Sequence, residues 1–287
     1  MRGAPLRPRG ASRTIGDVEN NRRADSIWAD IARIRAEGPL VHNITNFVVM
    51  NTTANALLAL GASPVMAHAE EEVEEMTAIA RSLVINIGTL SAPWVAAMFQ
   101  AGAVANRKAR PIVLDPVGAG ATSFRTATAR RLIEELSPAI VRGNASEIRA
   151  LVYDERGTRG VDSAHTTEDA ASAAGMLATG RGGVAVSSGA VDLILSRAGT
   201  ARVSNGHPMM AKVTGMGCTA SALAGAFAAV NPSAHDAAVN AMAVMGIAGE
   251  LAAEHSAGPG TFVPQFLDAL YRLSETEIRE RLKVRES

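Results

Sequence analysis

A glycine-rich turn that holds the only cysteine of the chain is the first place where the sequence offers chemistry. Residues 214–218 read TGMGC and run directly into a helical segment of small apolar residues, 219–230. At the start of a helix the first backbone N–H groups have no partner within the helix, and the helix dipole favours negative charge there. Gly215 and Gly217 therefore predict a phosphate or other anion site. The alternative is a tight turn in which Cys218 is only a small buried hydrophobic residue.

Charged and hydroxyl side chains stand at the ends of several apolar runs. Asp115 ends one run, and Arg142 ends the next and is soon followed by Glu147. Ser188 follows a third run. In open α/β sheets ligands bind at the carboxyl ends of the strands, so we expect these side chains to share one edge with the glycine turn. Carboxylates that hold Mg²⁺, with an arginine and amides that neutralise phosphate, are the groups that phosphoryl transfer needs.

Both carboxylates also have a purely structural interpretation. Asp115 precedes a proline and could order an Asx turn, and Glu147 could be a first-turn helix charge with Asn144 as the cap. Each residue alone favours the structural interpretation. The combination with Arg142 and the glycine turn favours phosphate and metal binding.

Two further features are interpreted as structural. The acidic run 70–75 begins a predicted helix, where the helix dipole stabilises acidic side chains in solvent. The six histidines show no paired spacing typical of a zinc site. His42 is interpreted as a residue that orders its loop by hydrogen bonding, with a place on the rim of a ligand site as the alternative.

Composition restricts the class of protein. The chain has 287 residues, of which 47% are hydrophobic, enough for a large core. Basic and acidic residues number 28 each, so no net charge points to nucleic acid or to a membrane surface, and a small-molecule partner is expected. A single cysteine forms no intrachain disulfide, and no apolar run is interpreted as long enough to span a bilayer. Together these features predict a cytoplasmic protein.

Apolar β-type runs alternate with helical stretches along the chain, which predicts a mostly parallel sheet with helices on both faces. Strands are predicted at 82–87, 111–115, 139–142, 183–187 and 191–195, and helices at 47–60, 70–80, 92–108, 126–136, 168–178, 219–230 and 235–255. No linker or repeat is visible, so a single domain is expected over residues 27–287. Residues 1–26, rich in arginine and without the apolar core of a signal peptide, are interpreted as a disordered basic tail or as the product of a start codon placed too far upstream.

Short blocks of sequence then follow one another in an order that is informative as a whole. They are HNITN at 42–46, LLALGASPVM at 57–66, NIGTL at 86–90, LDPVGAGAT at 114–122, RGNASE at 142–147, KVTG at 212–215, GC at 217–218 and GPGTF at 258–262. From about residue 27 to about residue 273 the chain resembles the hydroxyethylthiazole kinases. The joint presence of the blocks is highly specific, whereas a lone glycine turn is not.

The resemblance implies a ribokinase-like α/β fold, with three layers and a central, mostly parallel sheet. It implies phosphorylation of the primary alcohol of 4-methyl-5-(2-hydroxyethyl)thiazole by ATP with Mg²⁺, a step of thiamine salvage and biosynthesis. In such kinases the Asn46 and Met66 positions line the thiazole pocket, and Gly215 lies beside the substrate alcohol. Members are typically homotrimers with active sites between subunits, which implies that the Asn46 segment faces a neighbour and that mixed Asn46→Ala and Cys218→Ala subunits complement each other.

The resemblance also assigns the phosphate side of the site. It implies that Arg142 and Ser188 contact ATP and that Asp115 and Glu147 lie near phosphate and Mg²⁺, with metal contact direct or through water. Ser188 stands where threonine is common and keeps the hydroxyl. Met216 replaces a small residue between the glycines and needs room beside the phosphates, and the arginine-rich N-terminus has no counterpart in the family.

Cys218 occupies the place where related sugar kinases carry an aspartate base. An alcohol has a pKa of about 16 and a free thiol one of about 8.5, lower still at a helix N-terminus. Removing the alcohol proton before reaction would therefore cost about 10 kcal/mol. The hypothesis is that Cys218, as a thiolate or a hydrogen-bonded thiol, orients the hydroxyl and accepts its proton late, as the loose phosphoryl transition state collapses.

Other functions remain open at this point. A ribokinase-like kinase for another small heterocyclic alcohol, such as hydroxymethylpyrimidine, would share the phosphate side and differ within residues 43–66, which should face the ring. A non-catalytic nucleotide-binding or regulatory protein would not need Asp115, Arg142 and Glu147 together. A cysteine hydrolase would need a histidine base beside Cys218, and none is identifiable from the sequence.

Overall fold

The computed structural model of the chain describes residues 15–153, 167–181 and 183–287. The strands are β1 (Leu40–Ile44), β2 (Ser63–Val65), β3 (Ser82–Asn86), β4 (Ile112–Asp115), β5 (Ile140–Asn144), β6 (Val184–Ser188), β7 (Asp192–Ser196), β8 (Gly199–Val203) and β9 (Val284–Glu286). The helices are α1 (Ile15–Glu37), α2 (Met50–Leu60), α3 (Val73–Ile79), α4 (Ala92–Arg107), α5 (Ser123–Leu136), α6 (Ala145–Val152), α7 (Thr167–Arg181), α8 (Met216–Val230), α9 (Ala234–Glu254), α10 (Pro259–Arg272) and α11 (Glu275–Arg281), with a 3₁₀ turn η1 (Pro208–Lys212).

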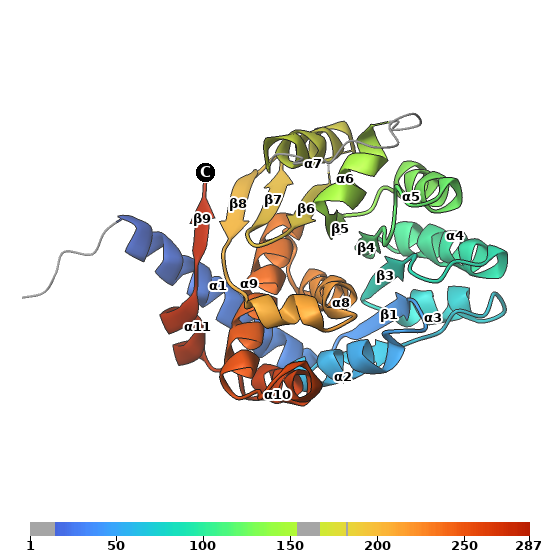
Figure 1. Ribbon diagram of the computed structural model, residues 1–287. Coiled ribbons are helices and arrows are strands. Elements are labelled where there is room, and N and C mark those ends of the chain that lie inside the picture. Colours follow the sequence, from blue (N-terminus) through green and yellow to red (C-terminus); the bar gives the residue numbers. More distant parts are fainter. Residues whose placement is uncertain (1–14, 154–166, 182) are drawn as a thin grey trace, which may run out of the picture.

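In this part of the chain the strands form one sheet in the order β2-β1-β3-β4-β5-β6-β7-β8-β9. The pairs from β2 to β6 are parallel, and those from β6 to β9 are antiparallel. Helices cover both faces, as Figure 1 shows, so the three-layer α/β fold predicted from the sequence is confirmed. The parallel strands therefore bring their carboxyl ends, and the polar residues there, to one edge of the sheet.

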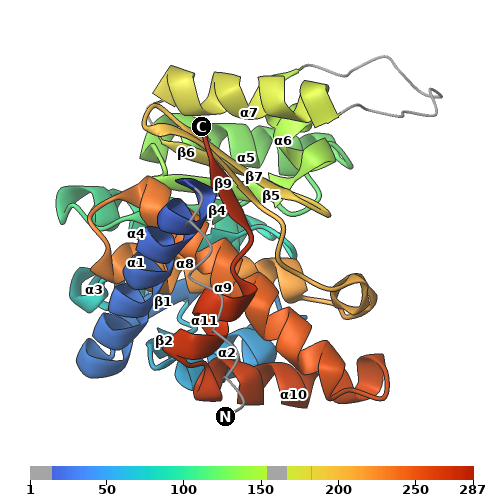
Figure 2. The same cartoon turned by 90° about the vertical axis from the view of Figure 1, so that its left-hand side faces the viewer.

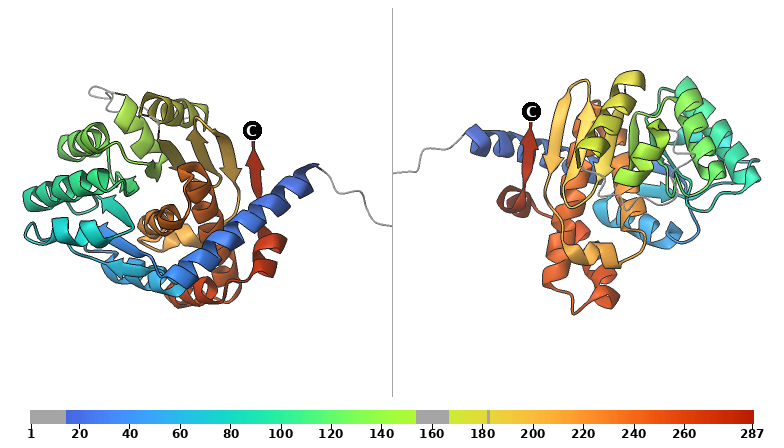
Figure 3. Two further views of the ribbon diagram at one scale, coloured as in Figure 1. Left: turned by 180° about the vertical axis from the view of Figure 1, so that it is seen from behind. Right: turned by 45° about the horizontal axis from the view of Figure 1, so that its top comes forward.

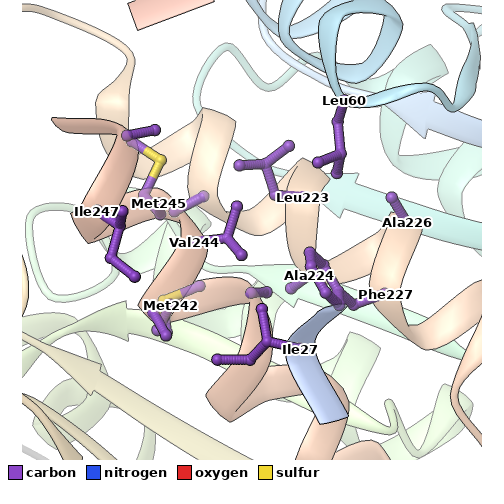
Figure 4. Packing of buried hydrophobic residues seen from close by; sticks show 14 of the residues in the cluster. Ile27, Leu60, Leu223, Ala224, Ala226, Phe227, Met242, Val244, Met245 and Ile247 are labelled. Atoms are coloured by element: carbon purple, nitrogen blue, oxygen red, sulfur yellow. The ribbon is translucent and has the colours of Figure 1, made fainter. Parts of the chain in front are cut away.

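One helix layer is built on α8 and α9, with α1 crossing its outer side (Figures 2 and 3). Alternate residues of β3 explain why both faces are covered: Val84 packs toward α8, and Leu83 and Ile85 pack into a second core with α4 and α5. Phe227 of α8 and Ile27 of α1 are fully buried among the side chains of the first layer (Figure 4). This packing fixes α8, and hence its N-terminus, against the sheet.

The small residues of α8 let it lie close to the strands. A β-carbon added at Gly225 would stand 2.4 Å from Val84 Cγ2, so only glycine permits this approach. The neighbouring helix α9 is long and apolar enough to span a bilayer by length and composition, contrary to the sequence-based expectation. Most of α9 is buried between the other helices, which explains its composition as that of a core helix.

The N-terminal boundary differs from the sequence-based expectation. Helix α1 begins at Ile15, so residues 15–26, predicted to lie in a disordered tail, belong to a helix. Ala24 is buried, and Arg23 forms ion pairs with Asp236 at 2.8 Å and with Glu286 at 2.5 Å. Arg23, one of the arginines of the predicted tail, thus holds α1 to α9 and β9. Residues 1–14 lie outside the described part of the chain.

The predicted strands are all present, but four further strands escaped prediction. β1 carries His42 and Asn43, which break its apolar pattern although both are buried. β2 has three residues, and β8 and β9 form the antiparallel edge where exposed polar residues are common. The acidic run 70–75 lies at the exposed start of α3, which agrees with its interpretation as a solvated helix face.

Candidate functional site

The glycine turn lies at the N-terminus of α8, on the carboxyl edge of the sheet. Gly215 is the N-cap residue and has φ of +85°, a left-handed conformation that glycine adopts without strain. A β-carbon there would also stand 2.7 Å from Val49 Cγ1. Met216 is 6% exposed and packs into the core of the α8–α9 layer, so its side chain finds room mainly by turning inward.

Arg142 and Ser188 meet at the ends of neighbouring strands. Arg142 Nη2 donates to Ser188 Oγ at 2.8 Å, and Ser188 Oγ donates to the Gly143 carbonyl at 3.2 Å. The Arg142 Nε atom is buried and has no hydrogen-bond partner among the described residues. A guanidinium with a free buried donor is suited to an anionic ligand.

A pocket of about 680 Å³ opens beside this pair. Arg142, Ser188, Gly215 and Gly217 line one part, and the other part is lined by apolar side chains that include Met210, Met242 and Met245. Such a volume, with cationic and amide donors at one end and apolar walls at the other, suits a nucleotide. The residues predicted for ATP and for the anion turn are thus brought together, whereas Asn46 and Met66 do not line this pocket.

Asp115 is 1% exposed at the end of β4. Its Oδ2 atom accepts hydrogen bonds from Asn86 Nδ2 at 3.0 Å and from Ser221 Oγ at 2.7 Å. Burial raises the pKa of Asp115 to about 6, although the Arg142 charge opposes the rise. The carboxyl is therefore ionised at neutral pH at a cost in stability, with Oδ1 left without a donor among the described residues.

Glu147 is placed differently. Its Oε2 accepts from the Asn144 backbone N–H and its Oε1 from the Gly118 N–H, both at 2.8 Å, while Asn144 Oδ1 accepts from the Glu147 N–H. This is the capping box that the structural interpretation anticipated. The same bonds fix the glycine-rich loop after β4 beside Asp115, whose pKa Glu147 helps to raise.

The two carboxylates suit a magnesium ion that is bound in part through water and substrate phosphates. The described residues contain no group of three or more acidic, histidine or cysteine side chains that could enclose a metal ion. Mg²⁺ keeps several waters and usually takes one or two carboxylates together with substrate phosphates. One free oxygen on Asp115, with Glu147 nearby, fits that mode of binding.

Cys218 lies in a small amide network one residue beyond Gly217. Asn46 Nδ2 stands 3.4 Å from Cys218 Sγ and 2.8 Å from Asn86 Oδ1. Burial and the Asp115 charge raise the pKa of the Cys218 thiol, and bonds from Asn46 and Asn86 oppose the rise only in part. The expectation of a lowered pKa at the helix N-terminus was wrong, and the thiol is neutral at physiological pH.

The segment that carries Met66 is tied to β1. Met66 follows β2 and is half-buried. Fully buried His42 contacts the Ala67 carbonyl through Nε2 and Thr77 Oγ1 through Nδ1, both at 2.8 Å. Desolvation lowers the pKa of His42, so the ring is neutral, with its proton on Nε2. Its interpretation as a loop-ordering residue is confirmed.

Sequence reasoning missed several residues of this site. Ser221 and Asn86 both bind Asp115, Arg125 donates to the carbonyls of two site loops, and Asp192 lines the pocket. Two signals were available. Ser221 follows Gly217 by one helical turn, and Asn86 ends a buried apolar strand as Asp115 does.

The comparisons with known proteins agree with this geometry. The sequence model of the hydroxyethylthiazole kinase family matches residues 31–276. The chain belongs to this family. A hydroxyethylthiazole kinase of Syntrophus aciditrophicus is 58% identical over 261 residues, which cover 91% of this chain and 97% of that protein. One from Nitratidesulfovibrio vulgaris (strain Miyazaki F) is 54% identical over 91% of this chain and 97% of its own length.

Solved structures show the same relationship. The hydroxyethylthiazole kinase protein of Pyrococcus horikoshii OT3 superposes with a TM-score of 0.85 at 46% identity, covering 92% of this chain and 99% of that one. A pyridoxal kinase of Staphylococcus aureus, solved with AMP-PCP and pyridoxal, has a TM-score of 0.60 at 17% identity over 87% and 98% of the two chains. This second likeness shows the ribokinase-like fold alone.

Proposed function

We propose that this hydroxyethylthiazole kinase family member transfers the terminal phosphoryl group of ATP to the primary alcohol of 4-methyl-5-(2-hydroxyethyl)thiazole, a step in thiamine biosynthesis and salvage. The observation that carries the proposal is the place of the α8 N-terminus. It lies between a nucleotide-sized pocket and the Asn46 and Cys218 side chains. A phosphoryl group held at this turn has the nucleotide on one side and an acceptor alcohol on the other.

The residues on the phosphate side of the site neutralise the negative charge of ATP. Arg142, Ser188 and the backbone N–H groups around Gly215 and Gly217 bind the phosphates of ATP, and their fixed positions need no reorganisation during transfer. Mg²⁺, held through Asp115 and Glu147 in part by way of water, supplies further neutralisation of the phosphates when bound. Loss of charge complementarity here would lower the affinity for ATP and the transfer rate together.

Cys218 acts on the alcohol as a neutral thiol. The sulfur is a weak acceptor that orients the hydroxyl. A thiol that keeps its own proton cannot take a second one, so the alcohol proton passes late to an oxygen of the transferred phosphoryl group, once the new O–P bond has made the hydroxyl acidic. Asn46 holds the sulfur in place, and Met66 with Asn46 lines the thiazole side. Most of the acceleration comes from positioning and electrostatic stabilisation rather than from a strong base.

The active form is a cytoplasmic homotrimer with sites at the subunit boundaries. Support comes from apolar side chains that are exposed next to Asn46: Phe47 is 65% and Val48 63% exposed. Leu58 and Ile79 are similarly exposed. Exposed apolar residues that gather beside a functional segment mark an interaction surface. A second subunit on this surface would close the open side of the thiazole pocket.

The proposal is tested by measuring ADP formation with the purified protein, ATP and Mg²⁺ against two alcohols. Turnover should depend on the hydroxyethylthiazole and be much weaker with hydroxymethylpyrimidine. Preference for the pyrimidine would establish the alternative, a kinase for another heterocyclic alcohol. Absence of turnover with both would refute the kinase assignment for these substrates, and ATP binding alone would then favour a regulatory role.

A further inference from the structure

Asn86 stands at the junction of the two halves of the site. It ends β3, is 1% exposed, and is the Cα partner of Asp115 in the parallel pairing of β3 and β4. Its Oδ1 accepts from Asn46 Nδ2 at 2.8 Å and from the Gly88 N–H at 2.9 Å, and its Nδ2 donates to Asp115 Oδ2 at 3.0 Å. Asn46 Nδ2 in turn stands 3.4 Å from Cys218 Sγ. One side chain therefore touches both the alcohol side and the phosphate side.

The orientation of the two amides follows from backbone groups that can only donate. The Gly88 N–H requires an oxygen on its side of Asn86, which leaves the amide nitrogen for Asp115. The Val48 N–H likewise requires Oδ1 of Asn46, at 3.1 Å, which turns the Asn46 nitrogen toward Asn86 and Cys218. If either amide flipped, its NH2 group would face a backbone N–H, and the hydrogen bond to that N–H would be lost.

We propose that Asn86 is a positioning residue for phosphoryl transfer, which holds Asn46 and the Asp115 carboxylate in register with the Cys218 thiol. The inference rests on the proposed function of this site. Asn86 does not line the nucleotide pocket and is buried from solvent, so it acts through its hydrogen-bond partners Asn46, Gly88 and Asp115. Buried networks of this kind are effective when every donor and acceptor is matched, and misplacement of a reacting group by about 1 Å can cost a hundredfold in rate.

Two substitutions separate a hydrogen-bonding role from a packing role. Asn86→Asp keeps the shape but replaces the donor to Asp115 by an oxygen, whereas Asn86→Ala removes the shape as well. If Asn86 positions by donation, both variants lose about tenfold or more in kcat, measured above neutral pH, with KM for ATP within about twofold of the original. If Asn86 only fills space, Asn86→Asp retains kcat and Asn86→Ala loses stability.

A control checks that a new charge alone has no such effect. Asn106 lies near the C-terminal end of α4, at the opposite edge of the sheet, where its amide donates to the Leu136 carbonyl. Asn106→Asp should leave kcat and both KM values unchanged. Should Asn86→Asp fail to fold, as judged by its thermal unfolding, Asn86→Ser and Asn86→Ala decide the question, because the serine hydroxyl can restore a donor and should recover part of the lost kcat.

A double-mutant cycle with Asn46→Ala tests the direct contact. If Asn86 acts through Asn46, adding Asn86→Ala to Asn46→Ala should cost less than about threefold more in kcat, because the two residues belong to one network. Full additivity, or an Asn86→Asp variant with unchanged kcat, would overturn the inference. Failure of the proposed function looks different: there, the original protein has no turnover with the thiazole alcohol. Loss of the Cys218 role alone is distinct again, because Cys218→Ala then keeps its kcat while the Asn86 cycle still shows coupling.

Discussion

Gly217 and Arg142 approach so closely that any side chain at 217 would have to displace the guanidinium: a β-carbon on Gly217 would lie 2.7 Å from Arg142 Nη1. The backbone at Gly217 has an ordinary helical conformation, so the need for glycine here comes from the guanidinium and not from the turn. The first turn of α8 and the arginine of β5 thus form one continuous surface, which we expect to bind phosphate. This relationship predicts a variant with a selective defect.

Gly217→Ala should fold normally and bind ATP poorly. The added methyl group can be accommodated only by displacing the end of the Arg142 side chain, which also breaks its bond to Ser188. We expect KM for ATP to rise about tenfold, the loss of roughly 1.4 kcal/mol of a charge-assisted contact. Steady-state kinetics with ATP varied measures this change, and an unaltered KM would remove Arg142 from the ATP site.

The matched control is Gly260→Ala. Gly260 lies in the first turn of α10, and an added β-carbon would meet no atom within 4 Å. Both variants exchange glycine for alanine near a helix start, so they share the gain from reduced freedom of the unfolded chain, about 0.4–1 kcal/mol. Only Gly217→Ala should change the kinetics.

Much of this site was accessible from the sequence because strand ends of a parallel sheet converge. The polar residues Asp115, Arg142 and Ser188 could be assigned to one edge before any contact was known, since each follows an apolar run. The pKa shifts in the site could not be predicted from the sequence, because they depend on burial. The Cys218 pKa rises through desolvation and the charge of Asp115, a residue 103 positions away in the chain whose proximity no local pattern reveals.

The start of helix α1 is a second feature that could not be predicted from the sequence. Its sequence is dominated by charged and polar residues and its arginines suggest a tail, yet Arg23 is satisfied by Asp236 and Glu286 from distant elements. Of residues 19–26 only Ala24 is buried, whereas the apolar stripe of α1, Ile27, Ile31 and Ile34, lies further along the helix. Tertiary ion pairs of this kind decide where the ordered chain begins and are invisible to periodicity.

Asp115→Asn should raise the stability of the protein and lower its kcat. The pKa of Asp115 is raised from 3.8 to about 6 in the folded state, so at neutral pH its ionisation opposes folding by up to about 3 kcal/mol. Asparagine keeps an acceptor for Asn86 and Ser221 without the charge. Thermal or denaturant unfolding at neutral pH should therefore show a higher free energy of unfolding, with reduced kcat.

The difference in stability between Asp115→Asn and the original protein should depend on pH. A raised carboxyl pKa means that the folded state binds the proton more tightly, so the original protein gains stability as pH falls from about 7 toward about 4, relative to Asp115→Asn. The advantage of the variant should shrink over that range. An advantage that is constant with pH would show that the carboxyl titrates near its ordinary value, and one that grows in acid would show that folding lowers its pKa.

Cys218 can be tested by two substitutions with different expectations. Cys218→Ala removes the group that orients the alcohol, and we expect kcat to fall about tenfold to a hundredfold with KM for ATP little changed. Cys218→Asp places a weak but well-positioned acceptor there, and activity should survive or rise. An unchanged kcat in Cys218→Ala would remove the role, and complete loss in Cys218→Asp would argue for a function specific to the thiol.

The subunit arrangement predicts which pairs of inactive variants can restore each other. Complementation of Asn46→Ala by Cys218→Ala, implied by the family resemblance, is no longer expected, because Asn46 and Cys218 of one chain are in contact at 3.4 Å. Met66 is different: it lies on the loop after β2 and does not line the nucleotide pocket, and His68 of the same loop packs edge-on to exposed Phe47 at 6.5 Å between ring centroids. If the trimer brings Met66 of one subunit to Cys218 of the next, mixing Met66→Ala with Cys218→Ala creates some intact sites.

With equal and random mixing in a homotrimer, a site that takes Cys218 from one subunit and Met66 from its neighbour is intact in about a quarter of cases. Unfolding and refolding the two variants together should thus recover about a quarter of the original kcat. The Asn46→Ala and Cys218→Ala mixture, treated identically, should stay at the level of its parents. Recovery in that mixture, or none with Met66→Ala although each variant is impaired alone and trimeric by light scattering, would contradict this division of the site between subunits.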